Sequence, residues 1–314
     1  MPSFSVPRPI AARVLALLRL ARRRWLVAGL ATAMTALVSV GCSTLETQQR
    51  KWIFRAQAAA AASDADLAEQ ARRLDMEGVW IAHRSAVAGR EIRLRGLWAE
   101  NDDPRAPVML YLHGARWDLT MSTFRVDRMR DMGFSVLAID YRGFGNSTDE
   151  LPSEKGVLED AEAAWRWLVA KHPGRKVYVY GHSLGGAVAV QLAARLADER
   201  HDAALGGLIA ESTFTSIGEL FRSFKWGWLP VEFLITERFD SLDAIQRVKA
   251  PLLVVHGSED GLVPSRLGRA LYEKATAPKR FVLVEGASHS STAWRGGDQY
   301  RAALRELFGL RLPT

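Results

Sequence analysis

Short apolar runs recur along the chain and are separated by longer amphipathic segments. The runs lie near residues 108–112, 134–139, 176–180, 206–211, 251–255 and 280–284. Short runs without polar alternation are typical of buried parallel strands, whose two faces are both covered. Helical patterns fill the gaps near 121–132, 155–171, 185–200, 265–276 and 297–308. This alternation predicts an α/β fold, with a mostly parallel twisted sheet and helices on both faces.

Two earlier segments, Val79–Ala82 and Glu91–Trp98, also predict strands. The second alternates polar and apolar residues, which is typical of a half-exposed antiparallel strand at the edge of a sheet. Upstream, residues 57–73 are rich in alanine, with acidic residues early and arginines late, an order that suits a helix dipole. We therefore expect a tether and helix over residues 42–75 and one α/β domain over 76–314.

Residues 215–246 interrupt the alternation between two expected strands. This insertion is rich in large apolar side chains, including Trp226 and Trp228 on either side of a glycine. We expect it to form a small helical cap whose apolar surface suits an acyl chain. Most of its aromatic residues could instead pack as core, and the two tryptophans are the better candidates for a pocket or membrane contact.

The basic charge of the chain is concentrated at its N-terminus. The formal net charge is +7, and six arginines with no acidic residue lie within residues 1–41, so the remainder carries only about +1. This distribution gives little support to nucleic-acid binding. An arginine-rich start followed by an apolar run from Trp25 to Gly41 instead indicates a targeting segment.

The apolar run ends at Cys42, the only cysteine in the chain. Residues 38–42 resemble a bacterial lipobox, which implies a signal peptide over residues 1–41 and an acylated Cys42 as the mature N-terminus. Ser43, which follows, implies transport to the outer membrane, facing the periplasm. An uncleaved N-terminal membrane anchor, or secretion with a free Cys42, are the alternatives. A lone cysteine also means that no internal disulfide supports the fold.

A serine lies at the apex of a sharp turn between an expected strand and an expected helix. The sequence Gly181-His182-Ser183-Leu184-Gly185 follows the apolar run that ends near residue 180. Glycines on both sides allow a strained turn that presents the Ser183 hydroxyl at the edge of the sheet. Because the serine also stands at a helix N-terminus, developing negative charge is favoured there. The pattern predicts a nucleophilic serine.

A nucleophilic serine needs a base, and the base needs an orienting acid. Asp260 follows the expected strand 251–255, and His289 follows the strand 280–284. All three residues therefore lie past the carboxyl ends of parallel strands, where such sheets gather catalytic groups. Glu259 is a weaker candidate for the acid, and either Asp260 or His289 could by itself be an ordinary loop residue. Their joint order predicts the set Ser183, Asp260 and His289.

An oxyanion formed at Ser183 needs two amide donors. The residue after the nucleophile, Leu184, is one candidate. The other is Ala115, in the loop that follows the strand 108–112, because Gly114 before it lets the backbone approach a substrate closely. We expect His113, by contrast, to have a structural role.

These motifs together resemble the α/β-hydrolase superfamily and are similar to its BEM46-like branch of small serine hydrolases. The resemblance covers most of residues 76–310 and rests on His113-Gly114, Asp140 to Ser147, Gly181 to Gly186, Glu211 to Phe214, Pro251 to Pro264 and His289. It implies acyl-bond hydrolysis by Ser183, Asp260 and His289. Where the branch usually continues its His-Gly with Asn-Ala-Gly, this chain has Ala115-Arg116-Trp117, which should reshape the mouth of the pocket.

The leading functional hypothesis is a serine hydrolase that cleaves esters of apolar character, such as a monoacylglycerol, a lysolipid or a short-chain ester. The chemistry requires no cofactor, and the histidines lack the spacing of a metal site. A peptidase, a thioesterase or an acyltransferase could use the same residues. A peptidase acting at an N-terminus would want carboxylates for the amine, and Glu211 and Glu232 are available. A non-catalytic envelope lipoprotein is the remaining alternative.

Overall fold

The computed structural model describes residues 41, 43–56 and 63–312. The chain divides into two compact units, Met1–Gln49 and Arg50–Thr314. Of the first unit, residues 41 and 43–49 are described and are helical. The expected signal peptide and Cys42 lie outside the described residues, apart from Gly41. Within the residues that the structure covers, no helix combines the length and the apolar character needed to cross a membrane.

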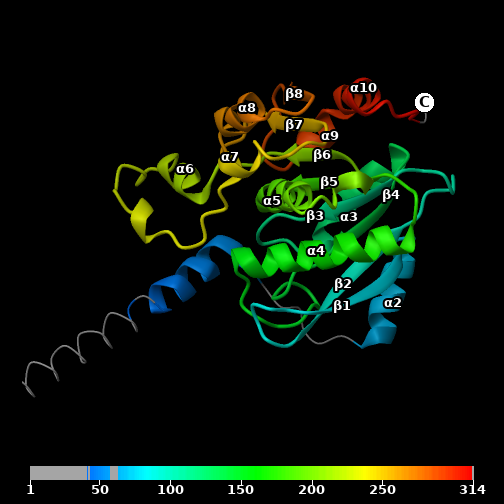
Figure 1. Ribbon diagram of the computed structural model, residues 1–314, viewed down its shortest axis with the longest axis horizontal. Coiled ribbons are helices and arrows are strands. Elements are labelled where there is room, and N and C mark those ends of the chain that lie inside the picture. The colour runs from blue at the N-terminus through cyan, green and yellow to red at the C-terminus, as the bar shows by residue number, and fades with distance from the viewer. Residues whose placement is uncertain (1–40, 42, 57–62, 313–314) are drawn as a thin grey trace, which may run out of the picture. The chain divides into compact units, whose positions relative to one another are not determined.

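The second unit is built on a mixed sheet of eight strands in the order β1-β2-β4-β3-β5-β6-β7-β8 (Figure 1). The strands are β1 (Glu77–Arg84), β2 (Glu91–Ala99), β3 (Val108–Leu112), β4 (Ser135–Ile139), β5 (Val177–His182), β6 (Leu205–Glu211), β7 (Leu252–Gly257) and β8 (Lys279–Val284). β1 and β2 pair antiparallel with each other, and β2 pairs antiparallel with β4. The pairs from β4 to β8 are all parallel, so the carboxyl ends of these strands meet at one edge.

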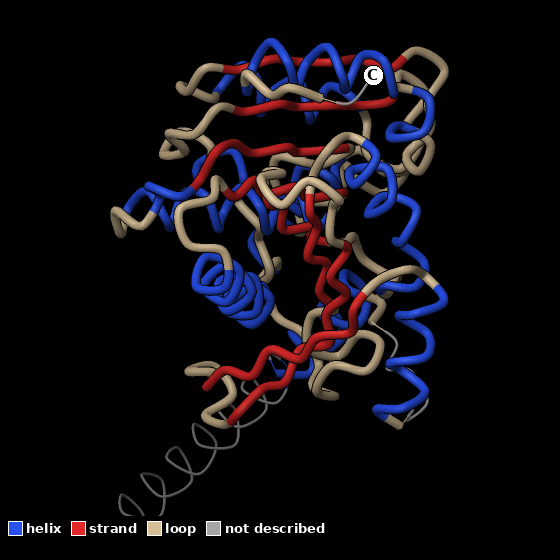
Figure 2. The backbone as a smooth tube through the Cα atoms, turned by 90° about the vertical axis from the view of Figure 1, so that its right-hand side faces the viewer, coloured by secondary structure: helices blue, strands red, loops and turns tan. Residues whose placement is uncertain are grey.

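Helices cover both faces of the sheet (Figure 2). They are α2 (Asp64–Arg73), α3 (Leu119–Asp131), α4 (Glu154–Lys171), α5 (Leu184–Asp198), α6 (Ile217–Arg222), α7 (Ser241–Ala244), α8 (Ser265–Lys274), α9 (Thr292–Arg295) and α10 (Gly297–Phe308), with short 3₁₀ turns at η1 (Asp202–Ala204) and η2 (Glu232–Leu234). One apolar core lies between the sheet and α4, α5, α7 and α8. A second lies between the other face and α2, α3 and α10. The mostly parallel α/β sheet with helices on both faces, expected from the hydrophobic pattern, is confirmed.

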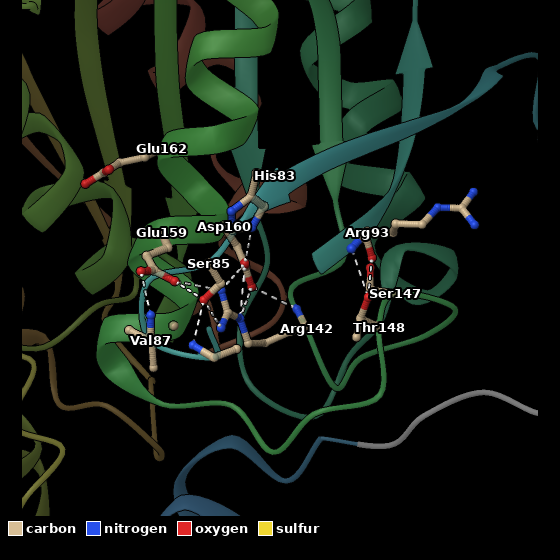
Figure 3. Close-up of polar contacts among 12 residues, drawn as sticks. His83, Ser85, Val87, Arg93, Arg142, Ser147, Thr148, Glu159, Asp160 and Glu162 are labelled. Atoms are coloured by element: carbon tan, nitrogen blue, oxygen red, sulfur yellow. Dashed lines mark hydrogen bonds and ion pairs between the residues drawn. The ribbon is translucent and has the colours of Figure 1, made fainter. Parts of the chain in front are cut away.

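A buried ionic cluster attaches the β1–β2 hairpin to α4 (Figure 3). Arg142, in the turn after β4, is fully buried and donates to Asp160 at 2.8 Å. The same carboxylate lies 3.0 Å from His83 Nε2 in β1, and Glu159 and Glu150 contact the guanidinium at 3.1 Å. Removing one member would leave a buried charge uncompensated, so the cluster restricts how the hairpin can pack. The turn that carries Arg142 thus has a structural role.

Residues 215–246, for which the sequence predicts a cap, contain α6, η2 and α7. The outer residues of the cap are exposed: Trp228 and Phe233 have 73% and 77% of their surface accessible. At its base, Phe239 is buried against Phe54, with ring centroids 5.9 Å apart.

The sequence analysis assigned residues 42–75 to a tether and helix. In the structure, residues 50–56 pack against the α/β domain, because Ile53 and Phe54 bury their side chains there.

Candidate active site

Ser183 occupies the turn between β5 and α5, at the carboxyl edge of the sheet. Its backbone has φ 55° and ψ −119°, a conformation that a residue with a side chain rarely adopts. The turn is possible because its neighbours have no side chains. A Cβ atom at Gly181 would overlap the backbone of Gly185, and one at Gly185 would overlap the carbonyl oxygen of Leu112. The close packing of strand, helix and loop therefore requires both glycines.

Asp260 and His289 meet at the same edge, in the loops after β7 and β8. His289 Nδ1 donates to Asp260 Oδ2 at 2.8 Å. The backbone amides of Leu262 and Val263 donate to the other carboxylate oxygen at 3.0 and 2.8 Å. Burial by itself would raise the pKa of Asp260, but hydrogen bonds from His256, His289 and Val263 outweigh it and hold the pKa well below its ordinary value. The carboxylate is therefore ionised and holds the His289 ring through Nδ1, which leaves Nε2 without a proton.

His182, which precedes Ser183, connects the turn to the His289 loop. Its Nε2 donates to the carbonyl oxygen of His289 at 3.1 Å, and the two imidazole centroids lie 5.0 Å apart. Burial, with nearby Arg125, lowers the pKa of His182 well below its ordinary value, so the ring is neutral. Within residues 63–312, no hydrogen bond joins the Ser183 hydroxyl to His289. Catalytic hydrogen bonds of this kind commonly tighten only when a substrate is bound.

The two expected oxyanion donors, Ala115 and Leu184, line the same cavity as Ser183. Leu184 is the first residue of α5, so its amide lies at a helix N-terminus. The loop of Ala115 approaches the serine closely, since a Cβ atom at Gly114 would lie 3.2 Å from Ser183 Cβ. Both candidate donors and the serine therefore lie at the same cavity.

The cavity at Ser183 has a volume of about 120 Å³ and is mostly apolar. Its walls come from the cap, from the loop after β7 and from residues 50–56. The lining residues are Trp52, Ile53, Arg55, Ala115, Arg116, Ser183, Leu184, Phe214, Ile217, Leu220, Phe221, Phe224, Leu262 and Val263. The sequence analysis expected the apolar cap wall. It did not identify Trp52, Ile53 and Arg55, because a short apolar segment far from the motifs carries no signal of its own.

A buried polar network lies next to the carboxyl edge of the sheet and contacts the His289 loop. Arg125 in α3 ion-pairs with Glu211 at the end of β6 at 3.2 Å, and both side chains are fully buried. Tyr180 donates to the same carboxylate at 2.6 Å, and Tyr300 is a further donor. Arg125 also donates to the carbonyl oxygen of Ser290 at 3.3 Å, next to His289. The sequence analysis missed this network, since nothing in the sequence pairs an arginine on α3 with a carboxylate at the end of β6.

His113 and Asp140 lie nearby but have structural partners. His113 Nδ1 donates to the carbonyl oxygen of Gly114 at 2.7 Å, and burial lowers the pKa of His113 to about 4. Asp140 accepts from the amide of Leu119 at 2.9 Å, and burial raises its pKa well above its ordinary value. In the described part of the chain, no group of three or more histidine, cysteine or acidic residues could hold a metal ion.

Comparisons with known proteins show which proteins this chain is similar to. The family profile described as serine aminopeptidase, S33, matches residues 102–242, a range that includes Ser183 but ends before Asp260 and His289. An uncharacterized protein of Mycobacterium tuberculosis is 32% identical over 285 residues, covering 87% of this chain and 92% of that protein. The lysophosphatidylserine lipase ABHD12 of Xenopus tropicalis is 35% identical over 190 residues. That match covers 55% of this chain and 48% of the lipase, so the chain spans about half the length of this relative.

Among solved structures, the esterase Pf2001 of Pyrococcus furiosus has a TM-score of 0.60 at 19% sequence identity. The superposition covers 81% of this chain and 98% of the esterase, which shows a shared fold. The profile, the relatives and the fold agree with one another. The chain belongs to the α/β-hydrolase superfamily and is a serine hydrolase.

Proposed function

We propose that this serine hydrolase cleaves carboxylic esters of apolar acyl groups, with Ser183 as nucleophile. The observation that carries the proposal is the apolar cavity beside Ser183, walled on one side by Phe214, Phe221 and Phe224 of the cap region. Such a wall stabilises an acyl chain by removing it from water. Monoacylglycerols, lysolipids and short-chain esters all fit this description.

In the proposed mechanism, His289 takes the proton from Ser183 as the hydroxyl attacks the ester carbonyl. Asp260 holds the imidazole in the required tautomer and stabilises its charged form. The backbone amides of Ala115 and Leu184 hold the oxyanion, and His289 returns the proton to the departing alcohol. Water then attacks the acyl-enzyme while His289 takes a proton from it. His289 returns this proton to Ser183 as the acid is released, which restores the enzyme.

The name of the ABHD12 relatives makes a lysophospholipid the first substrate class to test. We further propose that the chain belongs to the BEM46-like branch, on the motifs given above.

Ester cleavage is favoured over N-terminal peptide cleavage, because the two carboxylates that could bind a substrate amine already have partners. Glu211 is fully buried with Arg125, Tyr180 and Tyr300 as partners, and Glu232 is paired with Arg222. Neither is available to bind a substrate amine.

A fluorophosphonate probe followed by esters of graded chain length tests the proposal. We expect the probe to label the wild-type chain and not a Ser183→Ala variant. p-Nitrophenyl esters should be hydrolysed, with aminoacyl anilides turned over far more slowly. Absence of labelling in folded protein, or activity that survives Ser183→Ala, would contradict the proposal. Faster cleavage of the anilides would instead favour the peptidase.

We also propose that Cys42 is lipidated and anchors the enzyme to the bacterial envelope, at the outer membrane facing the periplasm. The support is the sequence at residues 38–42, at the end of the apolar run. Metabolic labelling with palmitate tests this, with Cys42→Ala as the matched variant. Label that persists in Cys42→Ala would exclude the proposal, and a membrane-bound chain without any label would favour the uncleaved N-terminal anchor.

A further inference from the structure

The cavity at Ser183 has an unusual charge composition. Among the described residues that line it, Arg55 and Arg116 are the only charged side chains, and all the others except Ser183 are apolar. An apolar cavity with two cations and no lining carboxylate is matched to an amphipathic anion. This inference rests on the proposed function, because it concerns the substrate of the same serine.

The two arginines are held next to each other by the backbone. The amide of Arg116 donates to the carbonyl oxygen of Phe54, the residue before Arg55, at 3.1 Å. Both arginines have positive φ, 48° for Arg55 and 74° for Arg116. Residues with a side chain adopt this backbone conformation uncommonly. The fold thus accepts backbone strain at both positions.

Within the described part of the chain, neither guanidinium group has a charged partner. Arg55 and Arg116 are exposed, and no described side chain forms a hydrogen bond or ion pair with either of them. Arg222, which lies on the neighbouring cap helix, shows the contrast, since it is paired with Glu219 and with Glu232. Two cations that line the cavity and have no partner among the described residues leave their charge for a ligand.

We propose that Arg55 and Arg116 form an anion subsite that binds a negatively charged group, a phosphodiester or a carboxylate, on the alcohol part of the substrate ester. Arg116 directly follows Ala115, the proposed oxyanion donor, so its side chain reaches a group only a few bonds from the scissile carbonyl. The apolar cap residues that line the same cavity take the acyl chain. Residues 50–56 therefore act as a specificity element.

Substrates that share an acyl chain and differ in the charged group on the alcohol test the subsite. A monoacylglycerol and a lysophosphatidylglycerol with the same acyl chain would be compared in the full-length wild type and in the double variant Arg55→Gln/Arg116→Gln. We expect kcat/KM for the phosphodiester to fall roughly tenfold, mainly through KM, with the neutral ester changed less than about twofold. An acyl ester of a hydroxy acid serves as the carboxylate arm and distinguishes the two anion sources. Arg266→Gln, an exposed arginine outside the cavity, is the control.

Equal losses for the charged and neutral esters would overturn the subsite, as would unchanged turnover of both anionic esters. Binding of dodecyl phosphate, measured by calorimetry against neutral dodecyl maltoside, tests the subsite without turnover. Binding that weakens about tenfold in the double variant supports the subsite even if no ester is cleaved, in which case the proposed function alone fails. Equal affinity in wild type and double variant overturns it.

Discussion

The catalytic edge and the cap of this enzyme use the same ionic chemistry in opposite surroundings. Beneath the edge, the ion pair of Arg125 and Glu211 is fully buried. On the cap, Arg222 pairs with Glu219 and Glu232, and each of these side chains keeps about half of its surface exposed. Burial makes the first pair indispensable once it is formed, while water screens the second.

The difference shows which part of the molecule holds its residues rigidly in place. Ser183 is held by strand–helix packing so close that glycines are required around it, and the His289 loop is tied to buried groups. The cap presents Trp228 and Phe233 to solvent. Chemistry at the edge should therefore depend steeply on single atoms, whereas changes on the outer cap should be tolerated.

The largest effect is expected at the edge, from Asp260→Asn. The amide N–H of asparagine can donate to His289 Nδ1 and so favour the tautomer protonated at Nε2, which cannot act as a base toward Ser183, and kcat should fall by roughly 10⁴-fold with little change in KM. Ester hydrolysis under saturating substrate measures this. Glu259→Gln is the matched control, because Glu259 is exposed and makes no contact with His289. Full activity of Asp260→Asn would remove this carboxylate from the mechanism.

Breaking the buried pair should affect stability strongly. Arg125→Met leaves the Glu211 carboxylate buried without its cation, and the free energy of unfolding should fall by about 3–5 kcal/mol. Urea denaturation measures the loss. The double variant Arg125→Met/Glu211→Gln should recover most of it, because no unpaired charge then remains. A single variant as stable as the wild type would show that the network is not needed.

The buried histidines at the edge predict that stability decreases in mild acid. For His113 and His182 the folded-state pKa lies below the ordinary value near 6.5. Above pH 6.5 each histidine is neutral in both the folded and the unfolded protein. Below pH 6.5 only the unfolded protein binds the proton, until the pH reaches the folded-state pKa, which is about 4 for His113. The free energy of unfolding should therefore decrease as the pH is lowered, by up to about 1.4 kcal/mol per pH unit for each histidine.

Denaturation in urea between pH 7 and pH 5 measures this slope. His182→Gln should make it shallower. His201→Gln, at an exposed histidine, should leave it unchanged. An identical slope in all three proteins would assign the acid sensitivity to other groups.

The smallest effect is expected on the cap. Arg222→Gln removes the partner of two exposed carboxylates, and Trp228→Ala removes a side chain with 73% of its surface exposed. Each should change the free energy of unfolding by less than about 1 kcal/mol. Thermal unfolding monitored by circular dichroism measures both. A loss comparable to that of Arg125→Met would abolish the distinction between the two regions.

The strands and helices of the α/β domain were predictable to within a few residues, because each strand is a short uninterrupted apolar run between polar turns. The turn around Ser183 was also predictable, since glycine at positions 181 and 185 is a local requirement of the backbone. The meeting of Asp260 and His289 at 2.8 Å follows from the parallel order of β7 and β8. Their catalytic roles stay predictions until tested.

The supporting network and the N-terminal wall of the cavity could not be predicted in this way. Arg125 and Glu211 are 86 positions apart, and an arginine on an amphipathic helix normally faces water. Residues 52–55 form too short a segment for periodicity to place.

The sequence by itself determined the order of strands and helices, the strained serine turn and the presence of an acid and a histidine after later strands, because these depend on local periodicity and backbone sterics. Only the tertiary structure decided which arginine is buried beneath the site, which two arginines stand at its rim, and which segment closes the cavity. Those contacts join parts of the chain that share no local pattern, and their free energy depends on burial, which only the assembled fold defines.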